Sequence, residues 1–325
     1  MSGTPMPDAV ARARGSWLAW PFWNAKERRL RAFCRIAIEA AALIACFFLI
    51  VDFLADPLTN SHHHGGFLAA LDATSFDHVM NMVVAVPMVA LGLLTIWAAG
   101  RFLDRRPFAD FRARMDGRWR SGLALGLCTG AIVMTLIFVF EYAAGYAEVT
   151  GFLVRNDTSL IGIALLFVAV KALSVGIIEE FVSRGYLLVN LADAFGTPAA
   201  VVLSSLAFGA AHFTNDNASV LSALGIAFIA TMFAVAAIAT GRLSTAIGLH
   251  ISWNLFEGSV FGFPDSGNKE ALSLMAVRQH GPDLITGGNF GPEAGLVSIV
   301  ASLAGIAIVL LWVRRQRARR SGSET

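Results

Sequence analysis

The sequence has few charged residues for its length. Asp, Glu, Lys and Arg make up 15% of the 325 residues, whereas soluble proteins average about a quarter. Hydrophobic residues reach 56%, so the composition excludes an ordinary soluble domain and indicates a protein that crosses a membrane several times. The net charge of +2 says nothing about partners, and we expect no nucleic-acid partner.

Several common patterns are also absent. The three cysteines, Cys34, Cys46 and Cys128, lack metal-ligand spacing, which argues against a disulfide framework or a zinc knuckle. The His-Glu-x-x-His helix of ordinary zinc proteases does not occur. Residues 1–35 have no apolar core and end in a basic run, so we expect no cleavable signal peptide and a cytoplasmic N-terminus. No internal repeat is evident, which argues mildly against a transporter built from inverted halves.

Apolar runs long enough to cross about 30 Å of hydrocarbon recur along the chain. They lie near 36–54, 80–100, 121–143, 159–195, 199–214, 220–240, 243–263 and 293–313. The sequence therefore predicts an all-α fold, a polytopic transmembrane bundle of about eight spans. The fourth run is too long for one crossing, and residues 264–292 are too rich in Gly, Pro and Asn for membrane depth.

These runs divide the chain into four expected parts. They are a basic amphipathic N-terminal segment (1–35), two spans with an arginine-rich cytoplasmic loop (36–120), a membrane core (121–313) and a basic cytoplasmic tail (314–325). In the first part, aromatic residues such as Trp17 and Trp20 precede a basic cluster that ends at Arg35. This order is typical of a helix lying on an anionic membrane face, or of an ordinary juxtamembrane anchor.

The distribution of Lys and Arg indicates the topology. With the N-terminus inside, all but four of the 25 Lys and Arg residues fall on the cytoplasmic side. The exceptions are Arg155, Lys269 and Arg278 in outer loops and Lys171 within a span. Because such a bias marks the cytoplasmic side, we expect both termini of this multi-pass protein in the cytoplasm.

The fourth run carries charges that need an explanation. Glu179, Glu180 and Arg184 follow almost wholly apolar residues, and one charge at the centre of a membrane helix costs roughly 2.5–3.5 kcal/mol. Glu180 and Arg184 are four residues apart and share one helix face, so they can neutralise each other. Glu179 lies about 100° round the helix and has no such local partner, which makes it the candidate for chemistry.

Three more polar groups lie in apolar helices. His212 ends the fifth run, and His250 and Asn254 share one face of the seventh. The glutamates and His212 are nearly equidistant from the predicted helix stop at 196–198, and His250 lies about 12 Å from the turn at Gly241 by helix rise. The sequence thus predicts that Glu179, His212, His250 and Asn254 surround one cavity, open toward the cytoplasm.

This set of groups suits hydrolysis in two ways. In the first, Glu179 takes a proton from water while Asn254 and one histidine donate to the oxyanion. In the second, Glu179, His212 and His250 bind Zn²⁺ and leave a fourth position open for water. The expected cofactor is therefore either none or zinc.

The motifs also match a known pattern. Glu-Glu-x-x-x-Arg at 179–184, Phe-x-x-x-His at 208–212 and His-x-x-x-Asn at 250–254 follow one another on separate apolar helices. In this the chain resembles the CAAX protease and bacteriocin-processing (CPBP, Abi) family, which are polytopic membrane endopeptidases. The resemblance covers about residues 120–313.

The resemblance implies roles for these residues. Glu179 would activate water with His212 aiding it or binding metal, and His250 and Asn254 would bind metal or stabilise the oxyanion. The Glu180–Arg184 pair would be structural or face the substrate, a membrane-associated peptide or protein, with or without a lipid group, in the lipid bilayer of the bacterial inner membrane. The family is described both as metal-dependent and as glutamate-dependent. A non-catalytic scaffold and a proton-coupled transporter using the same polar cluster are the competing functions.

Three patterns stand apart from this site. Gly122, Gly126 and Gly130 form a small-residue face that predicts close helix packing. Glu257 lies on the His250 face and either supports the site or points outward. The run 62–64 of three histidines is a weak candidate for metal binding.

Overall fold

The computed structural model describes residues 22–24, 27–63, 70–155 and 157–321, and these are mostly helical. The helices are α2 (Ala32–Ile50), α3 (Asp56–His63), α4 (Ala73–Ala98), α5 (Trp119–Ala143), α6 (Ile161–Glu180), α7 (Leu188–Phe195), α8 (Thr197–Ala211), α9 (Val220–Thr240), α10 (Leu243–Asn254), α11 (Asp283–Thr286) and α12 (Leu296–Ser321). The strands are β1 (Trp23–Asn24), β2 (Arg29–Leu30), β3 (Ala147–Arg155) and β4 (Leu272–Gln279).

Within the described residues, 7 helical stretches are long and apolar enough to cross a membrane. They are Ala32–Asn60, Ala73–Asp104, Trp119–Ala143, Ile161–Phe195, Thr197–Thr214, Val220–Thr240 and Leu296–Arg319. The remaining expected span is also helical, as α10 continues into a π-helical segment from Leu255 to Phe261. This confirms the polytopic helical bundle. The side on which the termini lie stays a prediction.

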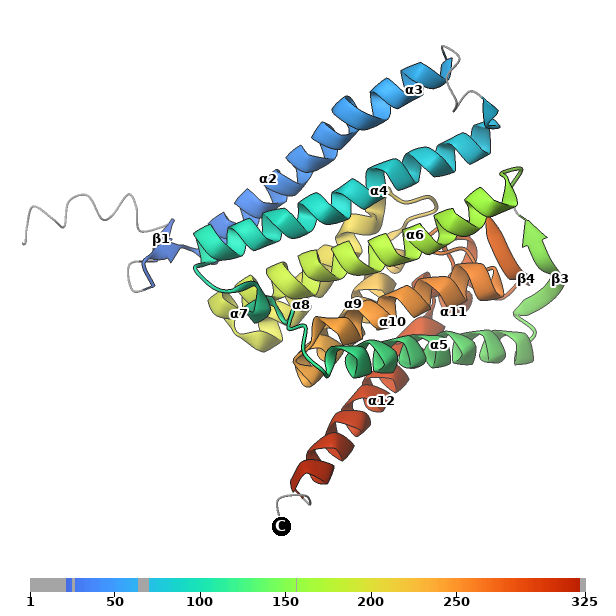
Figure 1. The fold of residues 1–325 in the computed structure, drawn as a ribbon. Coiled ribbons are helices and arrows are strands. Elements are labelled where there is room, and N and C mark those ends of the chain that lie inside the picture. Colours follow the sequence, from blue (N-terminus) through green and yellow to red (C-terminus); the bar gives the residue numbers. More distant parts are fainter. Residues whose placement is uncertain (1–21, 25–26, 64–69, 156, 322–325) are drawn as a thin grey trace, which may run out of the picture.

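Helix α10 lies at the centre of the bundle, and its burial and composition differ from those of the other spans for that reason. It packs against α5, α6 and α9, while α12 covers α9 and α5, and α2 and α4 extend the bundle beyond α6 (Figure 1). Every residue from Leu243 to Trp253 is buried. Because α10 contacts protein on all sides instead of lipid, it tolerates Ser, Thr and His side chains that a lipid-facing helix excludes.

The predicted glycine face lets α5 lie directly against α10. A Cβ at Gly126 would lie 2.1 Å from the carbonyl oxygen of Thr245, and one at Gly130 would lie 2.1 Å from Ser252 Oγ. Likewise, a Cβ at Gly248 on α10 would lie 2.3 Å from the carbonyl oxygen of Leu123. Such distances are far below van der Waals contact, so only glycine permits this spacing, which confirms the packing role.

Gly126→Ala should therefore destabilise the protein by about 1–3 kcal/mol, because the added methyl group pushes α10 away from α5. The matched control is Gly162→Ala in α6, where an added Cβ meets nothing within 4 Å. That variant should be neutral or slightly stabilising, since alanine favours a helix over glycine by up to about 1 kcal/mol. Thermal unfolding in detergent micelles measures both, and equal midpoints for the two variants would contradict the packing role.

The long fourth run forms one continuous helical stretch. Helix α6 continues through a π-helical segment from Phe181 to Leu187 into α7, which stops at Gly196. Gly196 has φ +80°, a conformation that glycine adopts readily, and Pro198 then begins α8. A π-helical segment also follows Asn254, so the helical winding changes directly after Glu180 in one helix and directly after Asn254 in the other.

Two regions differ from the sequence expectations. Residues 264–292 are not wholly irregular, because β4 pairs antiparallel with β3, from Ala147 opposite Gln279 to Arg155 opposite Leu272. This sheet lies at one end of the bundle (Figure 1). In the N-terminal segment, the described residues form the small β1–β2 hairpin instead of an amphipathic helix. Trp17, Trp20 and His64 lie outside the described residues.

At the opposite end, the basic loop before α5 is tied to the α9–α10 turn. Arg242 donates two hydrogen bonds to Asp116, at 2.5 Å and 2.7 Å. This guanidinium lowers the pKa of the Asp116 carboxyl to about 2. The backbone N–H of Leu243 also donates to Arg112 O at 3.0 Å, so the start of α10 is fixed in position.

Candidate active site

The four predicted site residues line one cavity of about 140 Å³. Glu179 reaches it from α6, His212 from the end of α8, and His250 and Asn254 from α10. Residues almost 80 positions apart in the chain thus line one space, as the turn positions predicted. What they do there follows from their individual contacts.

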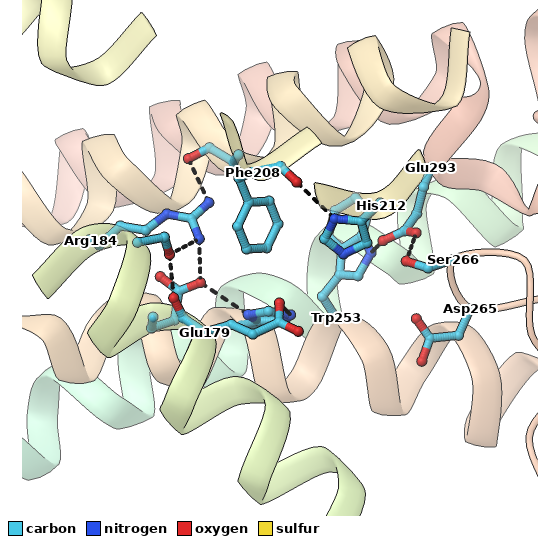
Figure 2. Close-up of polar contacts among 12 residues, drawn as sticks. Glu179, Arg184, Phe208, His212, Trp253, Asp265, Ser266 and Glu293 are labelled. Atoms are coloured by element: carbon cyan, nitrogen blue, oxygen red, sulfur yellow. Dashed lines mark hydrogen bonds and ion pairs between the residues drawn. The ribbon is translucent and has the colours of Figure 1, made fainter. Parts of the chain in front are cut away.

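The Glu180–Arg184 pair is fully buried behind the cavity. Arg184 Nη1 donates to Glu180 Oε1 at 2.8 Å, and Arg184 Nη2 donates to the carbonyl oxygen of Ala230 at 3.1 Å. The guanidinium also lies over the ring of Phe208, 4.2 Å from its centroid (Figure 2), and 5.3 Å from that of Phe233. The exposed fractions of the two charged side chains are 0% and 1%, so neither charged group is accessible to solvent.

Glu180 also orients His250, a contact that the sequence did not reveal. His250 Nδ1 lies 3.0 Å from Glu180 Oε1, the same oxygen that accepts from Arg184. Because an ionised carboxylate only accepts hydrogen bonds, Nδ1–H is the donor. The other ring nitrogen, Nε2, consequently points toward Glu179, with 4.0 Å between Nε2 and Glu179 Oε2.

Glu179 is the carboxylate left available. Its side chain is 34% exposed, and its Oε2 is buried without a hydrogen-bond partner. Ser183 Oγ donates to the backbone carbonyl of Glu179, not to its carboxylate. The side chain therefore faces the cavity (Figure 2) with one oxygen free to accept a proton.

His212 and Asn254 complete the polar surface. His212 begins a short 3-10 turn after α8, and its Nδ1–H donates to the carbonyl oxygen of Phe208 at 2.8 Å. A carbonyl can only accept, so Nε2 of the neutral ring carries the lone pair. Asn254 is the last residue of α10, and its amide borders the same cavity.

Comparison with known proteins addresses the family directly. Residues 161–256 match the family model described as type II CAAX prenyl endopeptidase Rce1-like. This stretch of the chain is therefore similar to the Rce1-like family. The match runs from α6 into the π-helical segment after α10 and includes all the motif residues, which confirms the resemblance found in the sequence. No curated protein and no solved structure matches the chain significantly.

The zinc ligands predicted from the sequence, Glu179, His212 and His250, do not form a compact set. Ligands of tetrahedral zinc bind at about 2.0–2.2 Å from the metal, so their donor atoms must lie close together. Among the described residues, Glu257, Asp265 and Glu293 form such a compact group. Their donor atoms all lie within 4.8 Å of one another. Glu179, His212 and His250 do not belong to a group of this kind, so their arrangement does not fit a zinc site.

The far wall of the cavity is acidic, which the sequence did not predict. Asp265, Ser266 and Glu293 line it, from the loop after α10 and the turn before α12 (Figure 2). Lys171, which precedes the two glutamates in the fourth run, lies 3.4 Å from Asp265 Oδ2 and also forms an ion pair with Glu270. The positive charge of Lys171 is therefore compensated by these two carboxylates.

These loop residues also revise the expected opening of the cavity. Asn215, Asp265 and Asn268 line the cavity from loops at the end of the bundle that carries β3 and β4, opposite the α7–α8 connection (Figure 1). On the other side, Arg184 stacked between two phenylalanine rings fills the bundle. The cavity thus lies beside the loops poor in Lys and Arg, not beside the basic turns where the sequence placed its opening.

Proposed function

We propose that the protein is an intramembrane endopeptidase in which Glu179 activates the attacking water. The observation that carries this proposal is the contrast between two adjacent glutamates. Glu180 is buried and held by Arg184, whereas Glu179 presents a carboxylate oxygen without a partner to a polar cavity. A carboxylate held free in a cavity is placed to act as a general base.

In the proposed reaction, Glu179 takes one proton from water as the hydroxide oxygen attacks the peptide carbonyl. The carbonyl oxygen becomes an oxyanion, which the Asn254 amide and His250 Nε2–H stabilise. His212 Nε2 accepts from the water and helps hold it. Glu179 then gives its proton to the leaving amine as the C–N bond breaks, so the carboxylate is regenerated.

Charge balance supports a donor role for His250. Glu179 and Glu180 bring two negative charges and Arg184 brings one positive charge, all in contact through His250 or Glu180. An imidazolium at His250 makes this group neutral, which a poorly solvated site favours. Both ring nitrogens then carry protons, one for Glu180 and one for the oxyanion.

The surroundings suit a membrane-associated substrate. A larger groove of about 780 Å³ between α2, α4 and α6 shares Lys171, Val175 and Asn268 with the active cavity. Its walls include Phe47, Met88 and other apolar side chains. An apolar segment or lipid chain of the substrate fits this groove while a peptide bond reaches Glu179. With the topology expected from Lys and Arg, the bond is reached from the extracytoplasmic side.

The test compares peptide termini in membranes of cells that produce wild type or Glu179→Ala. New termini that depend on Glu179 and map to membrane-associated proteins, on their extracytoplasmic side, are the expected result. Glu148→Gln, a change of a side chain that is 59% exposed on β3, is the control and should give the wild-type set. Identical termini in all three strains would instead favour a non-catalytic scaffold.

A further inference from the structure

Three carboxylates lie together at the acidic wall of the cavity. Glu257, Asp265 and Glu293 have exposed fractions of 0%, 4% and 5%. One carboxylate oxygen from each lies within 4.8 Å of the other two. They come from three separate segments, namely the π-helical segment after α10, the loop that follows and the turn Pro292–Ala294 before α12. The sequence assigned none of them this position.

The hydrogen bonds around this trio leave Glu257 without a partner. Trp253 Nε1–H donates to Glu293 Oε1 at 3.1 Å, and Ser266 Oγ–H donates to Glu293 Oε2 at 2.5 Å (Figure 2). Asp265 has Lys171 at 3.4 Å. Neither carboxylate oxygen of Glu257 has a hydrogen-bond partner, although its side chain is fully buried.

Among the described residues, Lys171 is the cation that forms an ion pair with this trio, through Asp265, and it also pairs with Glu270. One ammonium shared in this way does not neutralise three carboxylates. A buried carboxylate without compensation is strongly destabilising. A positive ion bound between the three oxygens removes that destabilisation.

We propose that Glu257, Asp265 and Glu293 bind one divalent cation, with Ca²⁺ as the preferred ion. An all-oxygen donor set selects hard cations over zinc or copper. Ca²⁺ accepts irregular sets of protein oxygens, whereas Mg²⁺ demands near-octahedral geometry and usually keeps several bound waters. The three oxygens lie within 4.8 Å of one another among buried side chains, a setting that suits Ca²⁺ better than a hydrated Mg²⁺.

The backbone beside the trio is built for a close approach. Gly291 has φ +105°, and a Cβ there would lie 2.0 Å from Pro264 O and 3.5 Å from Glu257 Oε1. Glycine thus lets the chain before Glu293 pass directly over Glu257. A bound cation would join this turn and the Asp265 loop to the π-helical segment that follows Asn254. It would hold one wall of the active cavity without contacting Glu179.

Thermal unfolding of the full chain in detergent, after EDTA and dialysis, tests the site through stability and not through proteolysis. Millimolar Ca²⁺ should raise the midpoint by about 5 °C, since a ligand at about 100 times its Kd stabilises the folded state measurably. Mg²⁺ should give a smaller rise. Glu257→Gln, which keeps the shape of the side chain, should lose this response, whereas the exposed Glu148→Gln should keep it.

Terbium luminescence gives a second measurement that needs no mutation of a ligand. Tb³⁺ replaces Ca²⁺ at oxygen sites and emits when a nearby tryptophan is excited. Trp253 touches Glu293, so wild type should show Tb³⁺ emission that Ca²⁺ displaces at one ion per chain. Trp253→Phe should lose most of this emission while its midpoint still rises with Ca²⁺.

The opposite pattern would overturn the cation site. If Ca²⁺, Mg²⁺ and Mn²⁺ all leave the wild-type midpoint unchanged and Tb³⁺ emission stays at background, the carboxylates are neutralised by protons. In that case Glu257→Gln alone should raise the midpoint without any metal. Neither result depends on whether Glu179 catalyses peptide cleavage.

Discussion

Glu179→Gln should lower the rate of peptide cleavage by about 10²–10⁴-fold, the usual contribution of a general base, while the amount of folded protein stays at the wild-type level. Glutamine keeps the size and shape of the side chain but cannot take a proton from water. The side chain is partly exposed and its Oε2 has no hydrogen-bond partner, so the change breaks no hydrogen bond of that oxygen. The measurement is single-turnover cleavage of a substrate identified from the membrane termini, with abundance measured in parallel.

Glu179→Asp is the matched control, because it keeps the base but shortens it by one methylene group. We expect an intermediate rate, since a misplacement of about 1 Å already weakens catalysis strongly. Unchanged turnover in Glu179→Gln would remove Glu179 from the reaction. Loss of folded protein in this variant would show that the carboxylate has a structural role.

Much of the site was predictable because local spacing and helix turns determine it. Glu180 and Arg184 pair within one helix turn, so four-residue spacing alone identified the contact. The turn at Gly196 placed Glu179 and His212 at similar depth without knowledge of any other contact. Helix type and span length likewise follow from apolar runs, because a membrane restricts the chain to few alternatives.

The rest depended on contacts between segments far apart in the chain. The bond between His250 and Glu180 requires the packing of α10 on α6, which no spacing within either helix specifies. Strand β4 pairs with β3 across more than a hundred residues, and its Gly- and Pro-rich surroundings indicated a loop instead. Glu257 lies against the turn before α12 and close to Asp265, both on other segments of the chain. The prediction that the cavity opens beside the basic turns was wrong for the same reason, because loops distant in the chain line it.

Glu180→Ala should have the opposite effect to Glu179→Gln, with a loss of about 3–5 kcal/mol in stability and a large fall in abundance. Removing this carboxylate leaves the Arg184 guanidinium, only 1% exposed, without its charge partner. His250 loses the acceptor for Nδ1–H at the same time. Thermal unfolding in detergent and the quantity of membrane-inserted protein measure the effect.

The double variant Glu180→Met/Arg184→Met separates the ion pair from its role at the site. Replacing both partners of a buried pair by apolar residues of similar volume is often neutral or stabilising, whereas removing one partner is not. The double variant should therefore recover most of the abundance that Glu180→Ala loses. It should still cleave substrate at least about 10²-fold more slowly than wild type, because His250 has no carboxylate to fix Nδ1–H and aim Nε2 at the oxyanion. Full activity in the stable double variant would show that His250 needs no orienting partner, and would remove Glu180 from the proposed mechanism.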